Sequence, residues 1–273
     1  MSVSLSPFTA IVIACLAGGA LSVIAAAGTL ALHSRWISRL VSFAVGALLG
    51  AVFLELLPHA LEHGATQRVM VTVLAGLLIF FLLEKLVLWR HSHLEAESLA
   101  GGLSAHGTES AIDSATAHSH GFDGGRSGLM ILIGNSVHNF CDGIVIAATF
   151  LADFALGTTT ALAIVAHAIP QQVGDFAVLL HSGYSRRRAF MYNLATGAAT
   201  LAGGLAGYAA LASMQEVLPT VLALAAASLL YVAVADLIPS LHRHPAPGET
   251  AQQLALIGVG IAIIAVAHVA LEH

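Results

Sequence analysis

Charged residues are scarce in this sequence. Only 9% of its 273 residues are Asp, Glu, Lys or Arg, and 58% are apolar, whereas soluble proteins carry about 25% charged and about 45–50% apolar residues. A water-exposed surface cannot be built from this composition. Ten basic and fifteen acidic residues give a formal net charge of −5, so the basic surface of a nucleic-acid-binding protein is also absent. We therefore expect a protein whose surface meets the lipid bilayer and which has no nucleic-acid partner.

Cysteine is nearly absent as well. The two cysteines, Cys15 and Cys141, both lie inside apolar runs. This number and placement exclude a disulfide framework and a cysteine-based zinc or iron–sulfur site. Thiol redox chemistry is therefore not expected.

Long apolar runs are plentiful. A bilayer core about 30 Å thick is crossed by about 20 helical residues, and eight runs reach roughly this length: 7–32, 37–58, 70–88, 128–151, 158–180, 189–212, 217–238 and 254–271. We predict an all-α polytopic membrane protein with eight transmembrane helices. Residues 1–273 form a single transmembrane domain in this interpretation.

The basic residues predict the orientation, because basic loops near helix ends stay on the cytoplasmic side. Nine of the ten fall in or beside the loops that follow the first, third, fifth and seventh segments, and only Arg68 falls on the opposite side. We expect both termini outside, in the periplasm, and the protein in the inner (plasma) membrane. The loop at 93–127 then lies in the cytoplasm. Its Gly, Ser, Ala and Thr content predicts disorder, and its histidines leave two interpretations open, a solvated linker or weak capture of a divalent cation: His93, His106, His118 and His120.

Two segments resemble each other. Residues 43–58 read FAVGALLGAVFLELLP and residues 224–239 read LAAASLLYVAVADLIP, so Glu55 and Asp236 each stand three residues before a proline. The two stretches run in opposite directions across the membrane in the predicted topology. Inverted repeats are a recurring architecture of secondary transporters. We predict an inverted repeat of helices 1–3 and 6–8 around the fourth and fifth helices.

Polar side chains concentrate in the fourth and fifth segments. A carboxylate at the bilayer centre costs at least about 2.5–3.5 kcal/mol, so such groups usually have a function or a partner. His138 and Asp142 are spaced i, i+4, with Asn139 beside them, and His167 and Gln171 repeat that spacing. Such pairs share one helix face. Pro170 interrupts the backbone hydrogen bonding between the second pair.

The depths of these four side chains in the membrane indicate that they lie close together. Counted from the inner ends, His138 and Gln171 lie about 14–15 Å deep, and Asp142 and His167 lie about 20 Å deep. Imidazole, carboxylate and amide oxygen suit a divalent transition cation such as Zn²⁺. The alternative is that these groups only form hydrogen bonds between packed helices. For the isolated His268 we prefer an interfacial or hydrogen-bonded role.

Three further acidic residues are candidates for the pathway of the cation. Asp175 lies one helical turn beyond Gln171, and Glu55 and Asp236 lie near the outer and inner ends of their segments. Glu55 and Asp236 have a second interpretation, because a carboxylate near a helix end is often simply solvated.

The residues His138 to Gly143, which read His-Asn-Phe-Cys-Asp-Gly, resemble the His-Asn-Phe-x-Asp-Gly signature in the fourth helix of the ZIP metal transporters. The fifth helix agrees in part. A similar subfamily has His-Glu-x-Pro-His-Glu-x-Gly-Asp there, whereas residues 167–175 read HAIPQQVGD. Eight helices, outward termini and the cytoplasmic His-bearing loop also fit. The chain resembles a bacterial member of this family.

The resemblance implies passage of Zn²⁺ or a similar cation into the cytoplasm by alternating access, with a four-helix core that moves against the other helices. Carried over by position, the metal ligands are His138, Asn139, Asp142, His167 and Gln171. This chain has Ala168, Gln171 and Gln172 where the subfamily has Glu, His and Glu. We therefore expect one loosely held cation instead of two, with Zn²⁺, Fe²⁺, Mn²⁺ or Cd²⁺ as the substrate.

The predicted protein is thus a transporter and not an enzyme, with no prosthetic group. An intramembrane metal-dependent enzyme is one alternative, although no His-Glu-x-x-His motif occurs. A metal sensor without transport and a haem-binding electron carrier are others. A homodimer fits this class of protein, but no residue indicates it.

Overall fold

The computed structural model describes residues 5–29, 34–103, 126–242 and 247–272. Every regular element in these ranges is helical, and consecutive elements join into eight helices. In chain order these are α1 (Pro7–Thr29), α2–η1–α3 (Ser34–Gly50, Ala51–Leu56, Leu57–His63), α4 (Thr66–Leu103), α5 (Arg126–Ala152), α6 (Phe154–His181), α7 (Arg186–Leu211), η2–α8–η3–α9 (Gln215–Val217, Leu218–Tyr231, Val232–Leu237, Ile238–Leu241) and α10 (Pro247–Glu272). The eight predicted helices are confirmed.

Most of these helices are long and apolar enough to cross a bilayer. Six satisfy both conditions within the described residues: Trp36–His63, Thr66–Leu86, Phe154–His181, Arg186–Leu211, Gln215–Leu241 and Gly248–Leu271. Helix α1 contributes a shorter apolar stretch, Pro7–Leu21. Helix α5 is 27 residues long, but the polar residues around His138 lower its hydropathy. The chain is a polytopic membrane protein.

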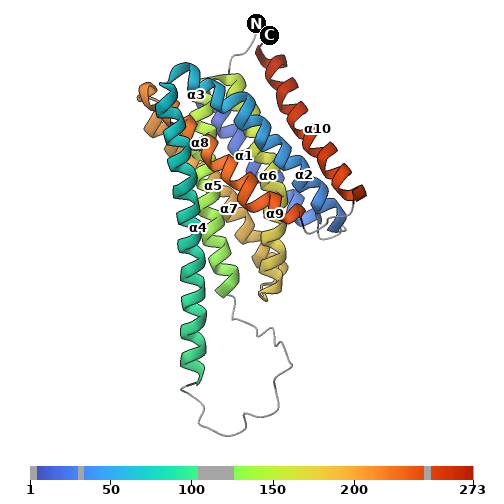
Figure 1. The fold of residues 1–273 in the computed structure, drawn as a ribbon. Coiled ribbons are helices and arrows are strands. Elements are labelled where there is room, and N and C mark those ends of the chain that lie inside the picture. Colours follow the sequence, from blue (N-terminus) through green and yellow to red (C-terminus); the bar gives the residue numbers. More distant parts are fainter. Residues whose placement is uncertain (1–4, 30–33, 104–125, 243–246, 273) are drawn as a thin grey trace.

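The predicted loop at 93–127 overlaps two helices. Helix α4 continues through residue 103, and α5 starts at Arg126. Residues 104–125, which include His106, His118 and His120, lie outside the described residues. Helix α4 therefore extends well past the apolar part of its length, at one end of the bundle (Figure 1).

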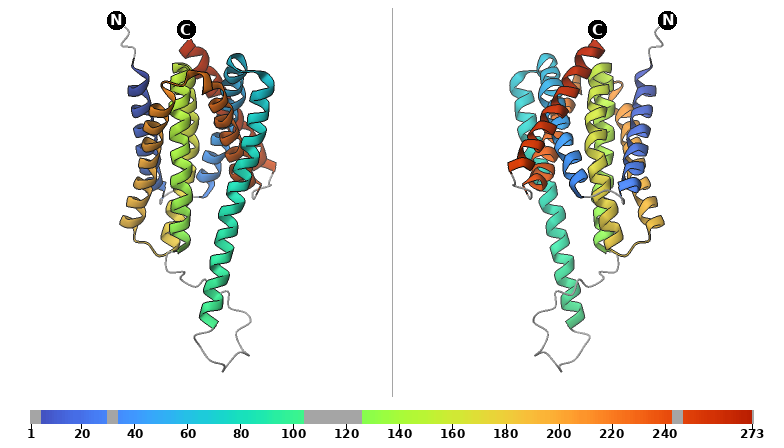
Figure 2. Two further views of the ribbon diagram at one scale, coloured as in Figure 1. Left: turned by 90° about the vertical axis from the view of Figure 1, so that its left-hand side faces the viewer. Right: turned by 90° about the vertical axis from the view of Figure 1, so that its right-hand side faces the viewer.

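The helices pack in two groups, which are visible side by side in Figure 2. Helices α1, α5, α6 and α7 all contact one another and form the site group. Helices α2–α3, α4, α8–α9 and α10 form the outer group, in which α10 packs on α2 and α8 packs on α3 and α4. The groups meet mainly where α6 contacts α2 and α10 and where α5 contacts α8. A hydrophobic core joins them, with Ile11 and Ile146 from one side and Leu48, Leu222 and Ile264 from the other.

The directions of the helices show which helix termini lie together at each end of the bundle. Helix α1 begins and α10 ends at the same end, and α5 begins and α6 ends at the opposite end, toward which α4 extends (Figure 1). Exposed Arg186, Arg187 and Arg188 at the start of α7 lie at this second end (Figure 1). Helices α5 and α6 are therefore antiparallel, as the depth argument requires.

Two π-helical turns interrupt the outer group at equivalent places. The segments η1 and η3 begin 181 residues apart, which is the offset between the two similar sequences at 43–58 and 224–239. In each, the residue before the proline donates to a carbonyl five residues back, Leu57 to Val52 and Ile238 to Ala233. Proline has no N–H and crowds the carbonyl four residues before it, so a wider turn accommodates it. The sequence similarity therefore extends to the same local backbone form.

Glycines set the spacing inside the site group. A Cβ atom at Gly143 of α5 would lie 2.0 Å from the Thr200 carbonyl oxygen of α7, and one at Gly203 would lie 1.9 Å from the Phe140 carbonyl oxygen. Only residues without a side chain permit backbones to approach this closely. The close contact fixes α5 against α7 beside the polar residues of α5.

Candidate metal centre

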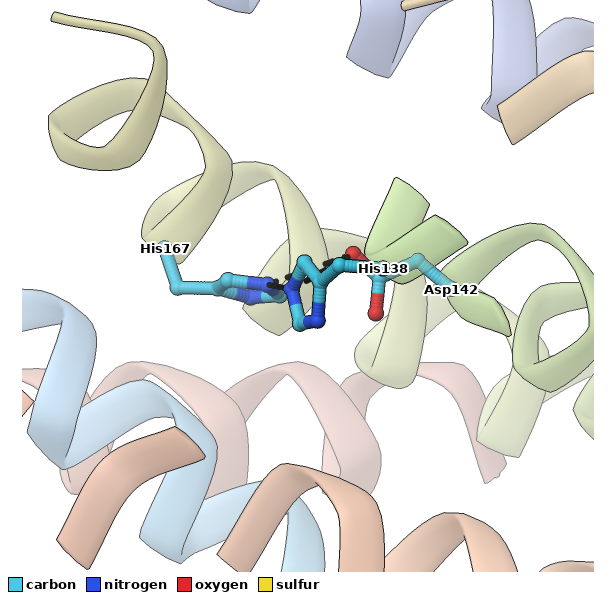
Figure 3. A group of neighbouring side chains, drawn as sticks. All are labelled: His138, Asp142 and His167. Carbon is cyan, nitrogen blue, oxygen red and sulfur yellow. Dashed lines mark hydrogen bonds and ion pairs between the residues drawn. The ribbon is translucent and has the colours of Figure 1, made fainter. Parts of the chain in front are cut away.

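The polar side chains of α5 and α6 meet halfway along these two helices. His138 and Asp142 are one turn apart on α5, and His167 faces them from α6. Each residue lies near the middle of its helix. Figure 3 shows the three side chains pointing toward one another. The predicted convergence of these three residues is therefore present in the structure.

Three ligand atoms form a nearly equilateral triangle. His138 Nε2 lies 3.3 Å from His167 Nε2, and Asp142 Oδ2 lies 3.4 Å from the first nitrogen and 3.3 Å from the second. Ligands bound to tetrahedral Zn²⁺ at about 2.0–2.2 Å stand about 3.3–3.6 Å apart. The triangle thus matches three corners of a tetrahedron. Among the described residues, this is the one group of three or more His, Cys, Asp or Glu side chains close enough to share a metal ion.

Burial makes the carboxylate expensive without a cation. Asp142 is 1% exposed and His167 is 0% exposed, whereas the His138 side chain is 22% exposed. Asp142 Oδ1 has no hydrogen-bond partner among the described residues. A buried anion needs opposite charge or hydrogen bonds, so the cluster favours a positive ligand. His138 is therefore the most accessible of the three side chains.

Backbone contacts orient the buried imidazole. His167 Nδ1 lies 3.3 Å from the Ala163 carbonyl oxygen. A carbonyl oxygen can only accept, so we assign the proton to Nδ1, which leaves the Nε2 lone pair directed at the cluster. Metal-binding histidines are commonly held in this way.

The two predicted amide ligands have other contacts. Asn139 is 3% exposed and donates from Nδ2 to the Thr196 carbonyl oxygen of α7 at 3.2 Å. Gln171 donates from Nε2 to Asn135 Oδ1. In both cases the amide nitrogen is engaged away from the triangle, and the amide oxygen is the atom that could serve a cation.

The three accessory carboxylates lie in different places. Asp175 accepts from Asn135 Nδ2, beneath Gln171 on α6. Asp236, in η3 of the outer group, is exposed but close enough to interact electrostatically with His138 and His167. Glu55 is 2% exposed, and its Oε2 lies 2.8 Å from His268 Nδ1 on α10. His268, isolated in the sequence, therefore lies beside a buried carboxylate.

Sequence reasoning missed several polar residues around the centre. Asn135 stands three residues before His138 and could have been found by extending the i, i+3 pattern of α5 toward its start. On α7, Asn193 donates to the Gln172 carbonyl oxygen at 3.0 Å, and Thr196 accepts from Gln172 Nε2 at 3.2 Å. Polar residues in the apolar run 189–212 were the only signal for them. These buried contacts tie α7 to α6, and the bond from Asn139 to the Thr196 carbonyl oxygen ties it to α5.

Comparison with known proteins identifies the family of this chain. The model of the ZIP Zinc transporter family matches residues 2–268. Zinc transporter ZIP13 from Homo sapiens is 31% identical over 272 residues, covering 84% of this chain and 70% of that protein. The Zinc transporter ZIP13 homolog from Drosophila melanogaster is 32% identical over 284 residues, covering 88% of this chain and 79% of that protein.

Other relatives are longer than the matched region. Zinc transporter ZIP13 from Pongo abelii is 32% identical over 245 residues, which are 84% of this chain and 66% of that protein. Zinc transporter ZIP5 from Homo sapiens is 32% identical over 267 residues, and there the match covers 49% of the relative. The match to the family model and these identities lead to one conclusion. The chain belongs to the ZIP zinc transporter family, a family of transporters and not of enzymes.

Proposed function

We propose that this chain carries a divalent transition-metal cation, with Zn²⁺ as the first candidate, into the cytoplasm. His138, Asp142 and His167 coordinate the cation, and Asn139 and Gln171 complete its shell through their amide oxygens. The observation that carries the proposal is the triangle of ligand atoms with edges of 3.3–3.4 Å. Two imidazoles and one carboxylate form a ligand set suited to Zn²⁺.

One cation at a time is the proposed stoichiometry. The methyl group of Ala168 offers no ligand atom for a second cation beside Asp142. Both residues line a small hollow, whose other lining residues are Asn139, Gln172 and Thr200, together with glycines of α1 and α7. Asp142 is the only carboxylate of the group, so the charge of one divalent ion is already only half compensated. The same ligands accept Fe²⁺, Mn²⁺ or Cd²⁺ with different strength.

The proposed direction is from the end where α1 begins toward the end where α5 begins. The basic residues support this orientation, because α7 starts at the second end (Figure 1) with the exposed Arg186, Arg187 and Arg188, and basic loops stay in the cytoplasm. We place both termini in the periplasm and the chain in the inner (plasma) membrane of a bacterial cell. The segment 93–127 then belongs to the cytoplasmic side.

The two helix groups support alternating access as the mechanism of transport. We propose that the site group moves as a body against the outer group, so that the centre opens first to one side and then to the other. The close α5–α7 contact at Gly143 and Gly203 supports a rigid site group. The equivalent π-helical turns η1 and η3 support the inverted repeat of helices 1–3 and 6–8, an architecture that transporters commonly use for this motion.

Metal influx into proteoliposomes tests the proposal. The purified chain is reconstituted around a Zn²⁺-sensitive dye, and His138→Ala and Asp142→Ala are compared with the wild type. We expect each variant to reduce influx at least tenfold, because loss of one of three ligands weakens binding and leaves buried groups unpaired. A matched control is His181→Ala on the same helix as His167, since His181 is exposed and its Nδ1 lies 2.8 Å from the Ala177 carbonyl oxygen of its own helix.

The outcomes separate transport from its alternatives. Full influx by His138→Ala or Asp142→Ala would refute the site. Stoichiometric Zn²⁺ binding without influx in the wild type would indicate a sensor that has lost transport. Influx should also fall in acid when no proton gradient is imposed, because protons compete with the cation for the imidazole nitrogens.

A further inference from the structure

A second polar group lies directly beneath the metal centre on the same two helices. Gln171 Nε2 donates to Asn135 Oδ1, and Asn135 Nδ2 donates to Asp175 Oδ2. This chain of two amides and one carboxylate connects α5 and α6. A carboxylate inside the membrane is costly, and apolar residues could fill the same space, so the group is a candidate for a function.

The position of this group continues the metal centre in one direction. Asn135 precedes His138 by three residues, and Gln171 and Asp175 follow His167 by four and eight residues. At about 1.5 Å per residue, the group lies about 4–12 Å from the centre toward the proposed cytoplasmic end. The spacings of three and four residues keep all these side chains on the helix faces that hold the centre. Gln171 is therefore within one helical turn of both His167 and Asp175.

The surroundings of the group are negative. Asn135 is 6% exposed, and Gln171 and Asp175 are partly buried. Asp236 of the outer group interacts electrostatically with Asp175 as well as with the two imidazoles of the centre. Two carboxylates from different helix groups thus approach this region. Their mutual repulsion is relieved when a cation lies between them.

The donor atoms differ in kind from those of the centre. Carboxylate and amide oxygens are hard ligands, which suit Mn²⁺, Mg²⁺ and Ca²⁺ and hold Zn²⁺ less firmly than imidazole does. In the structure the Asn135 NH₂ group occupies Asp175 Oδ2, where a cation would otherwise bind. Rotation of an amide exchanges its nitrogen and oxygen, so the same side chain can change from donor to ligand.

We propose that Asn135, Gln171 and Asp175 form a second cation station, built from oxygen atoms only, which receives the divalent cation from the metal centre before its release. This inference rests on the proposed function. Gln171 hands the cation over because it neighbours both positions. The station binds more weakly than the centre, and conduction requires such a step, since an ion held tightly at every site does not leave.

Mn²⁺ binding to the full chain in detergent tests the station. The background is the His138→Ala/His167→Ala double variant, which lacks both imidazoles of the centre, and free Mn²⁺ is followed by electron paramagnetic resonance. We expect one weak Mn²⁺ site per chain to remain. Asp175→Asn should weaken it at least tenfold, and Asn135→Asp should strengthen it at least threefold, because the second change adds a carboxylate. A gain of affinity cannot result from misfolding.

The control is Asp153→Asn, the same exchange at the other end of α6. Asp153 accepts from the Leu156 N–H at 2.9 Å, a bond that asparagine preserves, so Mn²⁺ affinity should not change. If the double variant does not fold, the same exchanges are measured in the wild-type chain after loading with one equivalent of Zn²⁺.

The station is refuted if Asp175→Asn and Asn135→Asp both leave Mn²⁺ affinity unchanged, or if the folded double variant binds no Mn²⁺. Either result leaves the metal centre untouched. Failure of the proposed function is a different observation, full Zn²⁺ influx by the His138→Ala or Asp142→Ala single variant.

Discussion

The two helix groups bury different kinds of side chain. Eleven of the fourteen buried polar residues among those described lie on α5, α6 and α7 of the site group, and only Ser42, Glu55 and Ser228 lie in the outer group. Both groups share one hydrophobic core. The outer group shows that helices of this protein can pack and bury residues with very few polar side chains. Their concentration in the site group is what the proposed cation site requires.

The glycine contact of the site group gives the largest expected effect. Gly143→Ala would place a Cβ atom 2.0 Å from the Thr200 carbonyl oxygen, and α5 would have to move away from α7. We expect a loss of about 3 kcal/mol in the free energy of unfolding, in the range of overpacked cores, measured by denaturant titration in detergent.

Gly134→Ala on the same helix is the matched control. A Cβ atom there meets nothing within 4 Å, and alanine favours a helix over glycine by about 1 kcal/mol, so this variant should be as stable as the wild type or slightly more stable. Equal stability of the Gly143 and Gly134 variants would mean that the close α5–α7 contact does not set the geometry of the site group.

The outer group is tested at the contact between His268 and Glu55. His268→Ala removes the nitrogen that lies 2.8 Å from Glu55 Oε2. Breaking a fully buried pair costs about 3–5 kcal/mol, and we expect about 2 kcal/mol because the His268 side chain is 31% exposed. The readout is thermal unfolding, with Zn²⁺ affinity measured in parallel.

His268→Gln is the control, since it keeps an N–H donor near Glu55. The Zn²⁺ affinity of the centre should not change in either variant, because Glu55 and His268 belong to the outer group. A weaker centre in the folded His268→Ala protein would contradict the separation of the two groups.

Gln171→His is expected to strengthen metal binding by the site group. A third imidazole one turn from His167 gives the site group another nitrogen ligand, and we expect Zn²⁺ to bind about tenfold more tightly, which corresponds to about 1.4 kcal/mol. Isothermal titration of the purified variant measures this. Influx should become slower, because release is delayed. Unchanged affinity would mean that residue 171 does not face the metal.

The helices and the core of the site could be predicted from the sequence, for specific reasons. Runs of apolar residues predicted all eight helices. The i, i+4 spacing of His138 and Asp142 predicted that the two side chains share one face of their helix. Antiparallel direction then placed His167 at the level of Asp142, and the structure has these groups 3.3 Å apart. The period of a helix and its rise per residue are nearly constant, so these inferences needed no knowledge of neighbouring helices.

Other features depended on contacts between distant segments. The role of Gly143 is visible only once Thr200 of α7 is placed against it. Glu55 and His268 are 213 residues apart and gave no local sign of their pairing. Gln171 was expected at the level of His138, and its hydrogen bond to Asn135 one turn away depends on how the amide is turned. Side-chain orientation follows from packing, which periodicity does not describe.

The π-helical turns have a consequence for how the sequence of the outer group is read. A wider turn adds about one residue per interruption, which rotates everything beyond it by about 100° relative to a regular α-helix. A helical wheel drawn straight through residues 51–56 would therefore assign His59 and His63 to the wrong side. Deleting a single residue from either turn would rotate Glu55 or Asp236 away from its present direction while leaving the composition of the helix almost unchanged.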